Sequence, residues 1–303
     1  MRIGLVGSGP WAELAVAPGL VAAPAVTLTH GWSRNHAALT ELADRHGFVS
    51  VPTFADLIES VDAVAFCVPP DVQAHLAPEA LDAGLPLLLE KPVARTVEQA
   101  ARLDDHVAPV LVHYTRLLDG HVRPWLDAAA QREWSRARVV LTNSATLGND
   151  PFGRSPWRRD DEGALWDLGP HALSALQVVL GAVTEVTARR RGADIVLATV
   201  HVGGATAQIV VSLASVTPVE TVELFDEAGA VHRLEATKRQ DGATTYAAMV
   251  AMLAAPGGAR HGPCDAAVRS PRFSTSIVAV LAAASRSLRE GSAVATDRRP
   301  PLT

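Results

Sequence analysis

The sequence lacks the cysteine content of a disulfide framework, the ligand spacing of a metal cluster and the long apolar run of a membrane span. Its 303 residues include only two cysteines, Cys67 and Cys264, which is too few for a disulfide framework and is typical of a reducing cytoplasm. No apolar run reaches the roughly 20 residues of a membrane span. The first residues lack the apolar core of a signal peptide, because Gly-Ser-Gly-Pro interrupts it. No spacing of histidine, cysteine or acidic residues suggests a metal site.

An excess of basic residues is also lacking. The 27 Lys and Arg residues are outnumbered by 32 Asp and Glu residues, which gives a net charge of −5 with both signs interspersed. This balance provides no general electrostatic reason to bind nucleic acid or an anionic membrane, so we expect a small-molecule ligand. The composition, with 48% hydrophobic and 19% charged residues, is globular, and the length suffices for two domains.

The first third of the chain alternates apolar strand-like runs with helical segments. Such alternation predicts an α/β fold with a parallel, doubly wound sheet. The expected strands are 3–6, 25–32, 49–51, 62–68, 85–89 and 110–113, and the expected helices are 13–21, 37–46, 53–59, 71–83 and 97–106. Asn35 and Gly47 are predicted to cap the second helix, and Pro18 is expected to kink or split the first.

The first strand leads into Gly7-Ser8-Gly9-Pro10-Trp11-Ala12, which matches G-x-G-x-x-A. Gly7 allows the tight turn, Gly9 lets the backbone approach a pyrophosphate, and Ala12 permits close helix–strand packing. Pro10 fits a first helical position, where no N–H donor is needed. An ordinary glycine turn is the alternative interpretation, but the position after a first strand favours a dinucleotide site.

Ligands of such sheets bind outside the carboxyl ends of the strands, where this chain places Ser33, Arg34, the Pro69-Pro70 turn and Glu90-Lys91-Pro92. NAD sites usually carry an acid about 20 residues beyond the glycines. Here residues 31–35 read Gly-Trp-Ser-Arg-Asn, with no acid. Because Arg34 could pair with a 2′-phosphate and Ser33 could donate a hydrogen bond, the sequence predicts NADP(H) in preference to NAD(H).

The second half predicts a mostly antiparallel sheet that helices cover on one face. The expected strands are 137–145, 183–191, 195–202, 205–213, 219–225 and 230–234, and the expected helices are 122–131, 164–180 and 272–288. We place the boundary so that residues 1–114 form the Rossmann domain and 115–303 an α+β domain, whose last helix could pack back on the first domain. A mixed set of side chains, Thr199, His201, Thr206 and Gln208, is expected on the bare face, which predicts a homodimer or homotetramer.

These motifs together resemble the Gfo/Idh/MocA family, the glucose–fructose oxidoreductase and inositol dehydrogenase superfamily. The matching residues are the G-x-G-x-x-A turn, Pro69, His75, Glu90-Lys91-Pro92, Trp157-Arg158 and Asp167-Leu-Gly-Pro-His171. The resemblance implies a Rossmann domain, an open-sheet α+β domain, and hydride transfer between a nicotinamide and a carbinol or carbonyl, usually of a sugar or cyclitol. It also implies that Pro69 and His75 lie at the nucleotide and that Trp157 and Arg158 lie near the substrate.

The chain departs from the family pattern at two places. Where many members have two glycines before the catalytic helix, it has Gly163-Ala164, and where many have an acid three residues after the histidine, it has Ser174. A hydroxyl cannot replace the charge of a carboxylate, so we expect substrate contacts near Ser174 to differ from those of inositol dehydrogenases.

Lys91, Asp167 and His171 are the candidate catalytic residues. Lys91 could instead be a solvated surface lysine, His171 a packed histidine, and Asp167 an acid that favours a helix dipole. Asp167 and His171 are four residues apart and share one face if the segment is helical. We hypothesise that His171 transfers the proton, that Asp167 orients and charges it, and that Lys91 binds the substrate oxygen. The reverse assignment makes Lys91 the base.

Tyr114 and Arg116, which follow the sixth strand, could line a substrate cleft or could merely hold the domains together. Three classes of function remain open. They are an NADP(H)-dependent oxidoreductase acting on a carbinol or carbonyl, a reductase of a C=N or C=C bond on the same scaffold, and a non-catalytic NADP(H) sensor. Retention of Lys91, Asp167 and His171 argues against the sensor, which has no need of a proton relay.

Overall fold

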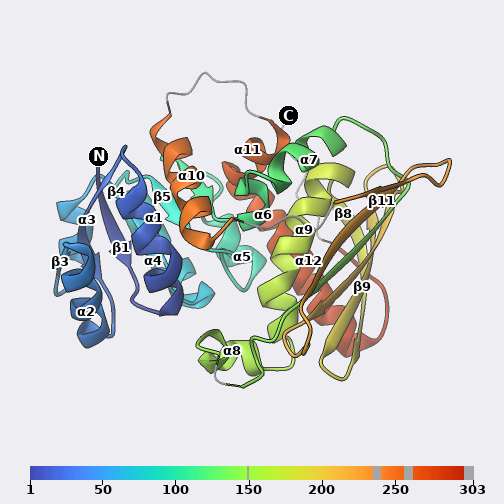
Figure 1. The fold of residues 1–303 in the computed structure, drawn as a ribbon, viewed down its shortest axis with the longest axis horizontal. Helices are drawn as coiled ribbons and strands as arrows, with labels where there is room; N and C mark the ends of the chain where they lie inside the picture. The colour runs from blue at the N-terminus through green and yellow to red at the C-terminus, as the bar shows by residue number, and fades with distance from the viewer. Residues whose placement is uncertain (149, 235–239, 256–261, 297–303) are drawn as a thin grey trace. The chain divides into compact units, whose positions relative to one another are not determined.

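The computed structural model describes residues 1–148, 150–234, 240–255 and 262–296, and it contains two compact units (Figure 1). Unit 1 consists of Met1–Gly120 and Arg239–Thr275, and unit 2 of His121–Lys238 and Ser276–Thr303. The domain boundary expected between residues 114 and 115 lies near the end of the first segment of unit 1 and stays a prediction. The part of the chain that is described holds no helix long and apolar enough to cross a membrane.

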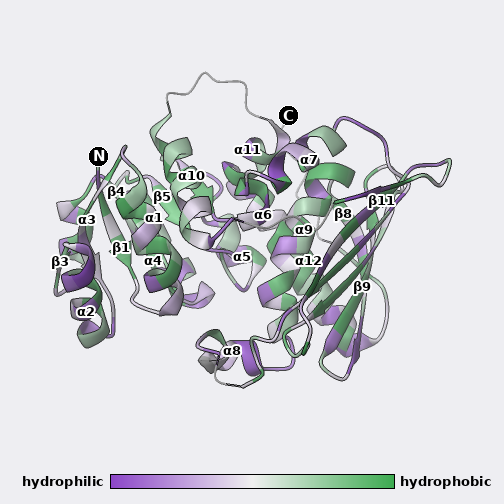
Figure 2. Ribbon diagram, viewed as in Figure 1, coloured by the Kyte–Doolittle hydropathy of each residue, from purple (hydrophilic) through white to green (hydrophobic). Residues whose placement is uncertain are grey.

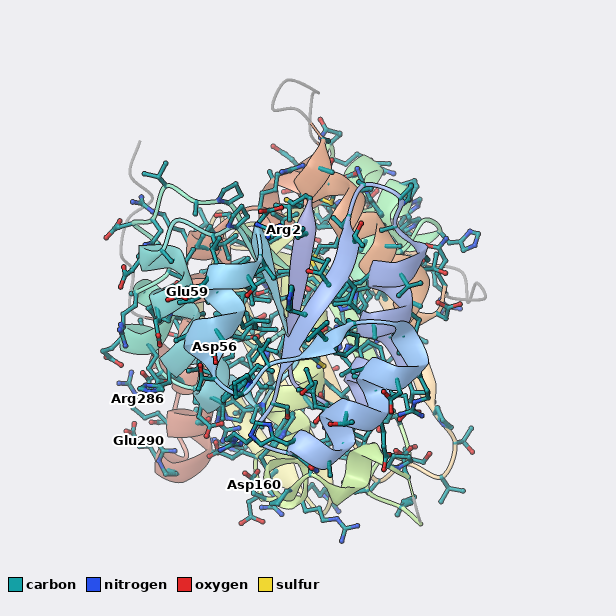
Figure 3. All side chains as sticks on the ribbon, turned by 90° about the vertical axis from the view of Figure 1, so that its left-hand side faces the viewer. Arg2, Asp56, Glu59, Asp160, Arg286 and Glu290 are labelled. Carbon is teal, nitrogen blue, oxygen red and sulfur yellow. The ribbon has the colours of Figure 1, made fainter. Side chains whose placement is uncertain are left out.

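Unit 1 is built on six parallel strands in the order β3-β2-β1-β4-β5-β6, which confirms the predicted doubly wound sheet. The strands are β1 (Arg2–Val6), β2 (Thr27–Trp32), β3 (Val49–Ser50), β4 (Ala63–Phe66), β5 (Leu87–Leu89) and β6 (Val110–Val112). Both β4 and β5 are buried throughout, as expected of strands covered on two faces. Arg2, labelled in Figure 3, begins β1, and a hydrogen bond from its guanidinium lowers the pKa of Asp62 to about 2.

Beyond the first helical segment, the helices of unit 1 are α2 (His36–His46), α3 (Phe54–Ser60), α4 (Pro70–Asp82), α5 (Val97–Ala101), α6 (Thr115–Leu118), α10 (Gly242–Ala254) and α11 (Pro263–Val268). Local sequence signals set the ends of α2. Asn35 caps α2 as predicted, because its side-chain oxygen accepts the Ala38 N–H at 3.2 Å, and Gly47 ends the helix with a φ of 73°. The predicted helix 97–106 is wrong in its second half, because α5 ends at Ala101.

Pro18 divides the helix that follows the glycine turn, as predicted. A π-helical segment, η1 (Ala12–Val16), precedes α1 (Ala17–Ala22), and the Ala17 N–H donates to the Ala12 carbonyl. Proline has no N–H to donate one turn back, so the wider π turn accommodates it where a regular α-helix could not continue.

Helix α10 joins unit 1 from far along the chain, and the sequence did not indicate it. It packs on η1 and α1 (Figure 1). A Cβ at Gly19 would lie 2.8 Å from the Ala243 carbonyl, so α1 and α10 approach as closely as they do because residue 19 is glycine. Most of α10 is apolar on every side, and such a helix has no amphipathic period to detect.

Unit 2 is built on a seven-stranded sheet in the order β12-β11-β7-β10-β9-β8-β13. The strands are β7 (Arg136–Thr142), β8 (Val183–Arg191), β9 (Asp194–His201), β10 (Thr206–Ser212), β11 (Val219–Phe225), β12 (Val231–Arg233) and β13 (Val294–Ala295). All neighbouring pairs are antiparallel except β7 and β10, which confirms the mostly antiparallel sheet. Its helices are α7 (Val122–Ala129), α8 (Pro156–Arg159), α9 (Gly163–Leu180) and most of α12 (Pro271–Glu290), with a 3₁₀ turn, η2 (Phe152–Arg154).

Helices cover one face of this sheet. Helix α9 packs on β7, β9 and β10 (Figure 1). Ser287 of α12 accepts the Ala188 N–H of β8 at 2.9 Å. Within the described residues, no helix of unit 2 packs on the other face. Hydrophilic and hydrophobic residues are interleaved along these strands (Figure 2), which is the alternation that predicted them.

The predicted side-chain facing of β9 is wrong. Thr199 and His201 are each 1% exposed and lie on the helix-covered face, whereas Ala198 and Val200 pair with Gln208 and Thr206 on the other. The error arises because both faces of β9 carry apolar residues, so alternation alone does not identify the buried side. Burial lowers the pKa of His201, whose Nδ1 bonds the Gly181 carbonyl at 2.8 Å.

Candidate active site

The glycine turn lies where β1 ends, next to the end of β4. Gly7 has a φ of 116°, and a Cβ there would overlap the Cys67 carbonyl, so glycine alone fits this position. The Gly7 N–H donates to the Trp32 carbonyl at 2.9 Å, which ties the turn to the end of β2. These two contacts place the turn at the carboxyl edge of the sheet, as the sequence predicted.

The next residues of the turn suit a bound dinucleotide. A Cβ at Gly9 would meet nothing within 4 Å, so the backbone there borders open space that a pyrophosphate could approach. Pro10 begins the helical segment, and Ala12 is completely buried beneath it. The residues present therefore fit the cofactor that the motif implies.

Ser8 and Ser33, both predicted at the nucleotide, are in contact. Their hydroxyl oxygens are 2.9 Å apart, and the Ser33 oxygen also accepts the Asn35 N–H at 3.2 Å. Ser33 is buried, whereas the neighbouring Arg34 is exposed. The glycine turn and the end of β2 thus meet through side chains, and Arg34 presents an exposed cation beside them.

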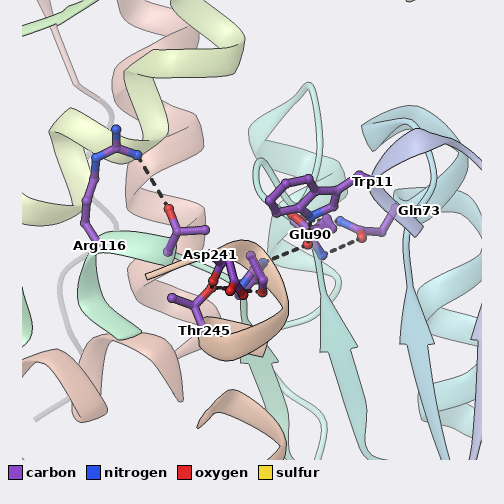
Figure 4. Close-up of polar contacts among 9 residues, drawn as sticks. Trp11, Gln73, Glu90, Arg116, Asp241 and Thr245 are labelled. Carbon is purple, nitrogen blue, oxygen red and sulfur yellow. Dashed lines mark hydrogen bonds and ion pairs between the residues drawn. The ribbon is translucent and has the colours of Figure 1, made fainter. Parts of the chain in front are cut away.

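Glu90 connects the glycine turn to the end of β6. Its Oε1 accepts the Trp11 indole N–H at 2.8 Å and lies 2.9 Å from Nδ1 of His113 (Figure 4). The other nitrogen of that imidazole lies 3.0 Å from the hydroxyl of Thr245 in α10. The two rings that hold Glu90 lie near each other, with centroids 6.2 Å apart.

Gln73 of α4 holds the backbone on both sides of Glu90 (Figure 4). Its Oε1 accepts the Glu90 N–H at 2.9 Å, and its Nε2 donates to the Glu90 carbonyl at 2.8 Å and to the Val93 carbonyl at 3.3 Å. Lys91 lies between Glu90 and Val93, the two residues whose backbone Gln73 binds. It is partly buried and precedes a cis peptide bond to Pro92.

The other rim residues that the resemblance implied have less defined surroundings. Pro69, which precedes α4, and His75, on α4, are both exposed. Their roles at the nucleotide stay predictions.

Tyr114 and Arg116, predicted near the substrate, are both buried. The Tyr114 hydroxyl donates to Ser274 at 3.1 Å, its ring meets Phe273 edge-on, and burial raises the pKa of the hydroxyl well above its usual value. These contacts favour a packing role for Tyr114 within unit 1, and its contact with substrate stays a prediction.

Asp167 and His171 lie in α9 of unit 2, one turn apart, which confirms the expected helix. Both are 7% exposed. The Arg158 guanidinium holds the Asp167 carboxylate in a fork, with Nε 3.1 Å from Oδ2 and Nη2 3.4 Å from Oδ1. Arg158, expected near the substrate, and Asp167, a catalytic candidate, are therefore paired with each other.

The residues at and beside the two departures from the family pattern have defined contacts in unit 2. A Cβ at Gly163, the glycine that precedes Ala164, would overlap the Arg158 carbonyl, so glycine is required where α9 begins beside α8. The Ser174 hydroxyl donates to the His171 carbonyl at 3.2 Å, one turn back in the helix. The Arg158 guanidinium lies over the Trp157 ring, with its Cζ atom 4.3 Å from the ring centroid. Ser174 thus uses its hydroxyl within α9.

Gln73 and His113, which contact Glu90, and Thr245, which contacts His113, were not predicted. No motif marks them, and Thr245 is 132 residues from His113 in the chain. The available signal was the placement of His113 directly after the sixth strand, at the same carboxyl edge as Glu90. Among the described residues, no cluster of three or more His, Cys, Asp or Glu side chains could hold a metal ion.

Family models match both halves of the chain. Residues 1–111 match "Oxidoreductase family, NAD-binding Rossmann fold", and residues 136–232 match "GFO/IDH/MocA C-terminal domain". The chain belongs to the GFO/IDH/MocA family of oxidoreductases. The family resemblance stated from the motifs is thereby confirmed.

Characterised relatives match parts of the chain. Galactose 1-dehydrogenase of Pseudomonas fluorescens is 36% identical over 104 residues, which are 33% of this chain and 32% of that enzyme. D-xylose 1-dehydrogenase (NADP(+)) 2 of Haloferax volcanii is 26% identical over 163 residues, 52% of this chain and 50% of that enzyme. Oxidoreductase P35 of Formosa agariphila is 23% identical over 60% of this chain and 61% of that protein. The matches thus span about a third to three fifths of these relatives.

Solved structures share the whole fold. GenD2 from gentamicin A biosynthesis, in complex with NAD, has a TM-score of 0.81 at 22% identity, covering 98% of this chain and 97% of that one. A myo-inositol dehydrogenase described as putative, from Sinorhizobium meliloti 1021, has a TM-score of 0.79 at 20% identity, covering 98% and 100%. At these identities the likeness establishes the fold, a Rossmann-type unit and a unit with a mostly antiparallel sheet.

Proposed function

We propose that the chain is an NAD(P)-dependent oxidoreductase that transfers a hydride between nicotinamide and a carbinol or carbonyl of a sugar-like or cyclitol-like substrate. The observation that carries this proposal is the hydrogen bond between Trp11 of the glycine turn and Glu90. It joins the expected pyrophosphate site to the segment that bears Lys91, within one unit. The names of the relatives, a galactose and a xylose dehydrogenase, support a sugar-like substrate.

The composition supports a chemical role for Lys91. Of the 27 Lys and Arg residues in the sequence, only Lys91 and Lys238 are lysines. A chain that otherwise uses arginine for its positive charges has a lysine at the carboxyl end of β5. A lysine ammonium there can bind a substrate oxygen and, unlike a guanidinium, can also take part in proton transfer.

The proposed roles follow from what each side chain can donate. When bound, the nicotinamide supplies the hydride acceptor or donor. His171 takes the hydroxyl proton in oxidation and returns it in reduction, and Lys91 binds the substrate oxygen and stabilises its developing charge. Asp167 orients His171, and a carboxylate has enough acceptor sites to do so while it pairs with Arg158. The rival assignment gives the proton to Lys91.

A substrate screen tests the function itself. We expect spectrophotometric assays to show NADPH oxidation with ketone forms of sugars or cyclitols and the reverse reaction with the polyols. Cyclic imines and enones should leave the absorbance unchanged, because the proton carriers serve an oxygen. Turnover of imines or enones alone would assign the chain to the other reductase class, and cofactor binding without turnover of any class would favour a sensor.

The second prediction concerns the cofactor. Because residues 31–35 have no acid and Arg34 is exposed at the edge of the sheet, we expect NADPH to bind at least about tenfold more tightly than NADH. Arg34→Ala should remove that difference, whereas Arg102→Ala, which removes another exposed charge from the end of α5, should not. Calorimetric dissociation constants measure this, and equal constants in the parent protein contradict it. The relatives leave the question open, since one structure holds NAD and one enzyme is named for NADP.

The third prediction separates the two proton carriers. His171→Ala should reduce turnover by about 10²–10⁴ and remove the pH dependence contributed by the histidine. Lys91→Met should reduce turnover as well but keep the pH dependence that the histidine contributes. The measurement is turnover against pH for the parent and both variants, with a substrate from the screen. If His171→Ala keeps near-parent turnover with an unchanged profile, the proton belongs to Lys91 or to water.

The fourth prediction concerns assembly. The face of the sheet that no described helix of unit 2 covers has an apolar centre of Val140, Val196, Ala198, Val200 and Val210. Ion pairs of Glu223 with Arg138 and Arg233 flank this centre, so the face carries both signs of charge and suits a second copy of itself. We expect a homodimer, or a tetramer built from it. Light scattering at micromolar concentration that shows only monomer contradicts this.

A further inference from the structure

Glu90 is the meeting point of two ring donors that come from different elements. The Trp11 indole and the His113 imidazole approach the same carboxylate oxygen, at 2.8 and 2.9 Å. The side chain of Glu90 is 12% exposed, and that of His113 is 0% exposed. In such surroundings a charge-assisted hydrogen bond is strong and its loss is not replaced by water.

The backbone that leads to Lys91 is fixed at the same place. Gln73 bonds the Glu90 N–H and carbonyl much as a neighbouring strand would. Its Nε2 also donates to the carbonyl of Val93, so the backbone is held on both sides of Lys91. With the peptide held by Gln73, the orientation of the Glu90 side chain is set by Trp11 and His113. Lys91 follows directly, so its direction depends on both sets of bonds.

Helix α10 sets the direction of the imidazole. Thr245 places its hydroxyl 3.0 Å from Nε2 of His113, and Tyr246 meets the same ring edge-on with centroids 4.9 Å apart. Each ring nitrogen of His113 thus has a partner, the Glu90 carboxylate at Nδ1 and the Thr245 hydroxyl at Nε2, and the two contacts together fix the direction of the ring. The first turn of α10 also lies against Trp11, because a Cβ at Gly242 would overlap the indole.

We propose that His113 is a positioning residue, which holds the Glu90 carboxylate and thereby Lys91 in place, and that Thr245 fixes the orientation of its ring. His113 is fully buried and acts only through Glu90. This role rests on the proposed function as far as turnover is concerned. The position of the Lys91 side chain can be observed without any substrate, so the two can fail separately.

Two substitutions of His113 separate its two hydrogen bonds. The amide of His113→Asn can take the place of Nδ1 and keep a donor to Glu90, whereas the longer amide of His113→Gln takes the place of Nε2 and reaches Thr245. We expect His113→Gln to lower kcat by up to about 100-fold with little change in KM, because Lys91 is misplaced at the developing charge. His113→Asn should keep most of the parent kcat.

An activity-independent readout uses the scarcity of lysine. Because the chain has only Lys91 and Lys238, reductive methylation with ¹³C-formaldehyde in a Lys238→Arg background leaves Lys91 as the one labelled side chain. The amino-terminal resonance is assigned as the signal that persists in Lys91→Arg. We expect the dimethyl-Lys91 resonance to move in His113→Gln and to stay near its parent position in His113→Asn.

The outcomes are distinguishable. If the dimethyl-Lys91 resonance and kcat are unchanged in both variants, the positioning role is wrong. If both variants lose kcat equally and both have a lowered unfolding midpoint, His113 has a packing role alone. If both variants fail to fold, Thr245→Val removes the hydroxyl that contacts Nε2 of His113. We then expect a smaller shift of the dimethyl-Lys91 resonance, and an unchanged resonance would contradict the positioning role. If no substrate is found, the proposed function fails while the resonance still decides the positioning.

Discussion

The close passage of the backbone at Gly7 past the Cys67 carbonyl is the constraint on which the rest of the site depends. No side chain fits there, and the positive φ turns the chain sharply out of β1. The turn then brings Ser8 to Ser33 and Trp11 to Glu90, two contacts that unite the ends of three strands. Gly9, two residues beyond this turn, borders open space.

Much of unit 1 could be predicted because its signals are local. Apolar runs marked the buried strands, Asn35 and Gly47 marked the ends of α2, and the glycine spacing marked the turn. Helix α10 could not be predicted, since it is apolar on every side and its place against η1 depends on contacts far apart in sequence. The prediction of which side chains of β9 are buried was wrong for a related reason, because apolar residues on both faces weaken the alternation.

The candidate site was predicted in its motifs and not in its contacts. Sequence spacing placed Lys91 at the end of β5 and put Asp167 and His171 one turn apart on α9. It gave no indication that Arg158 pairs with Asp167 or that His113 holds Glu90, because each pairing depends on side-chain geometry at the end of an element. Such contacts appear only once the elements are placed in space, and they decide how each catalytic candidate is oriented.

The measurement that tests the account most directly is the dissociation constant of NADPH for the parent protein and for Gly9→Ala. The added methyl group meets no protein atom within 4 Å and requires no unusual φ, so the unfolding midpoint should not change. We expect the parent to bind NADPH in a saturable manner and Gly9→Ala to bind at least about tenfold more weakly, because the methyl group occupies the approach of the pyrophosphate. Equal affinity in both proteins, or no binding by a folded parent, would contradict a dinucleotide site at this turn.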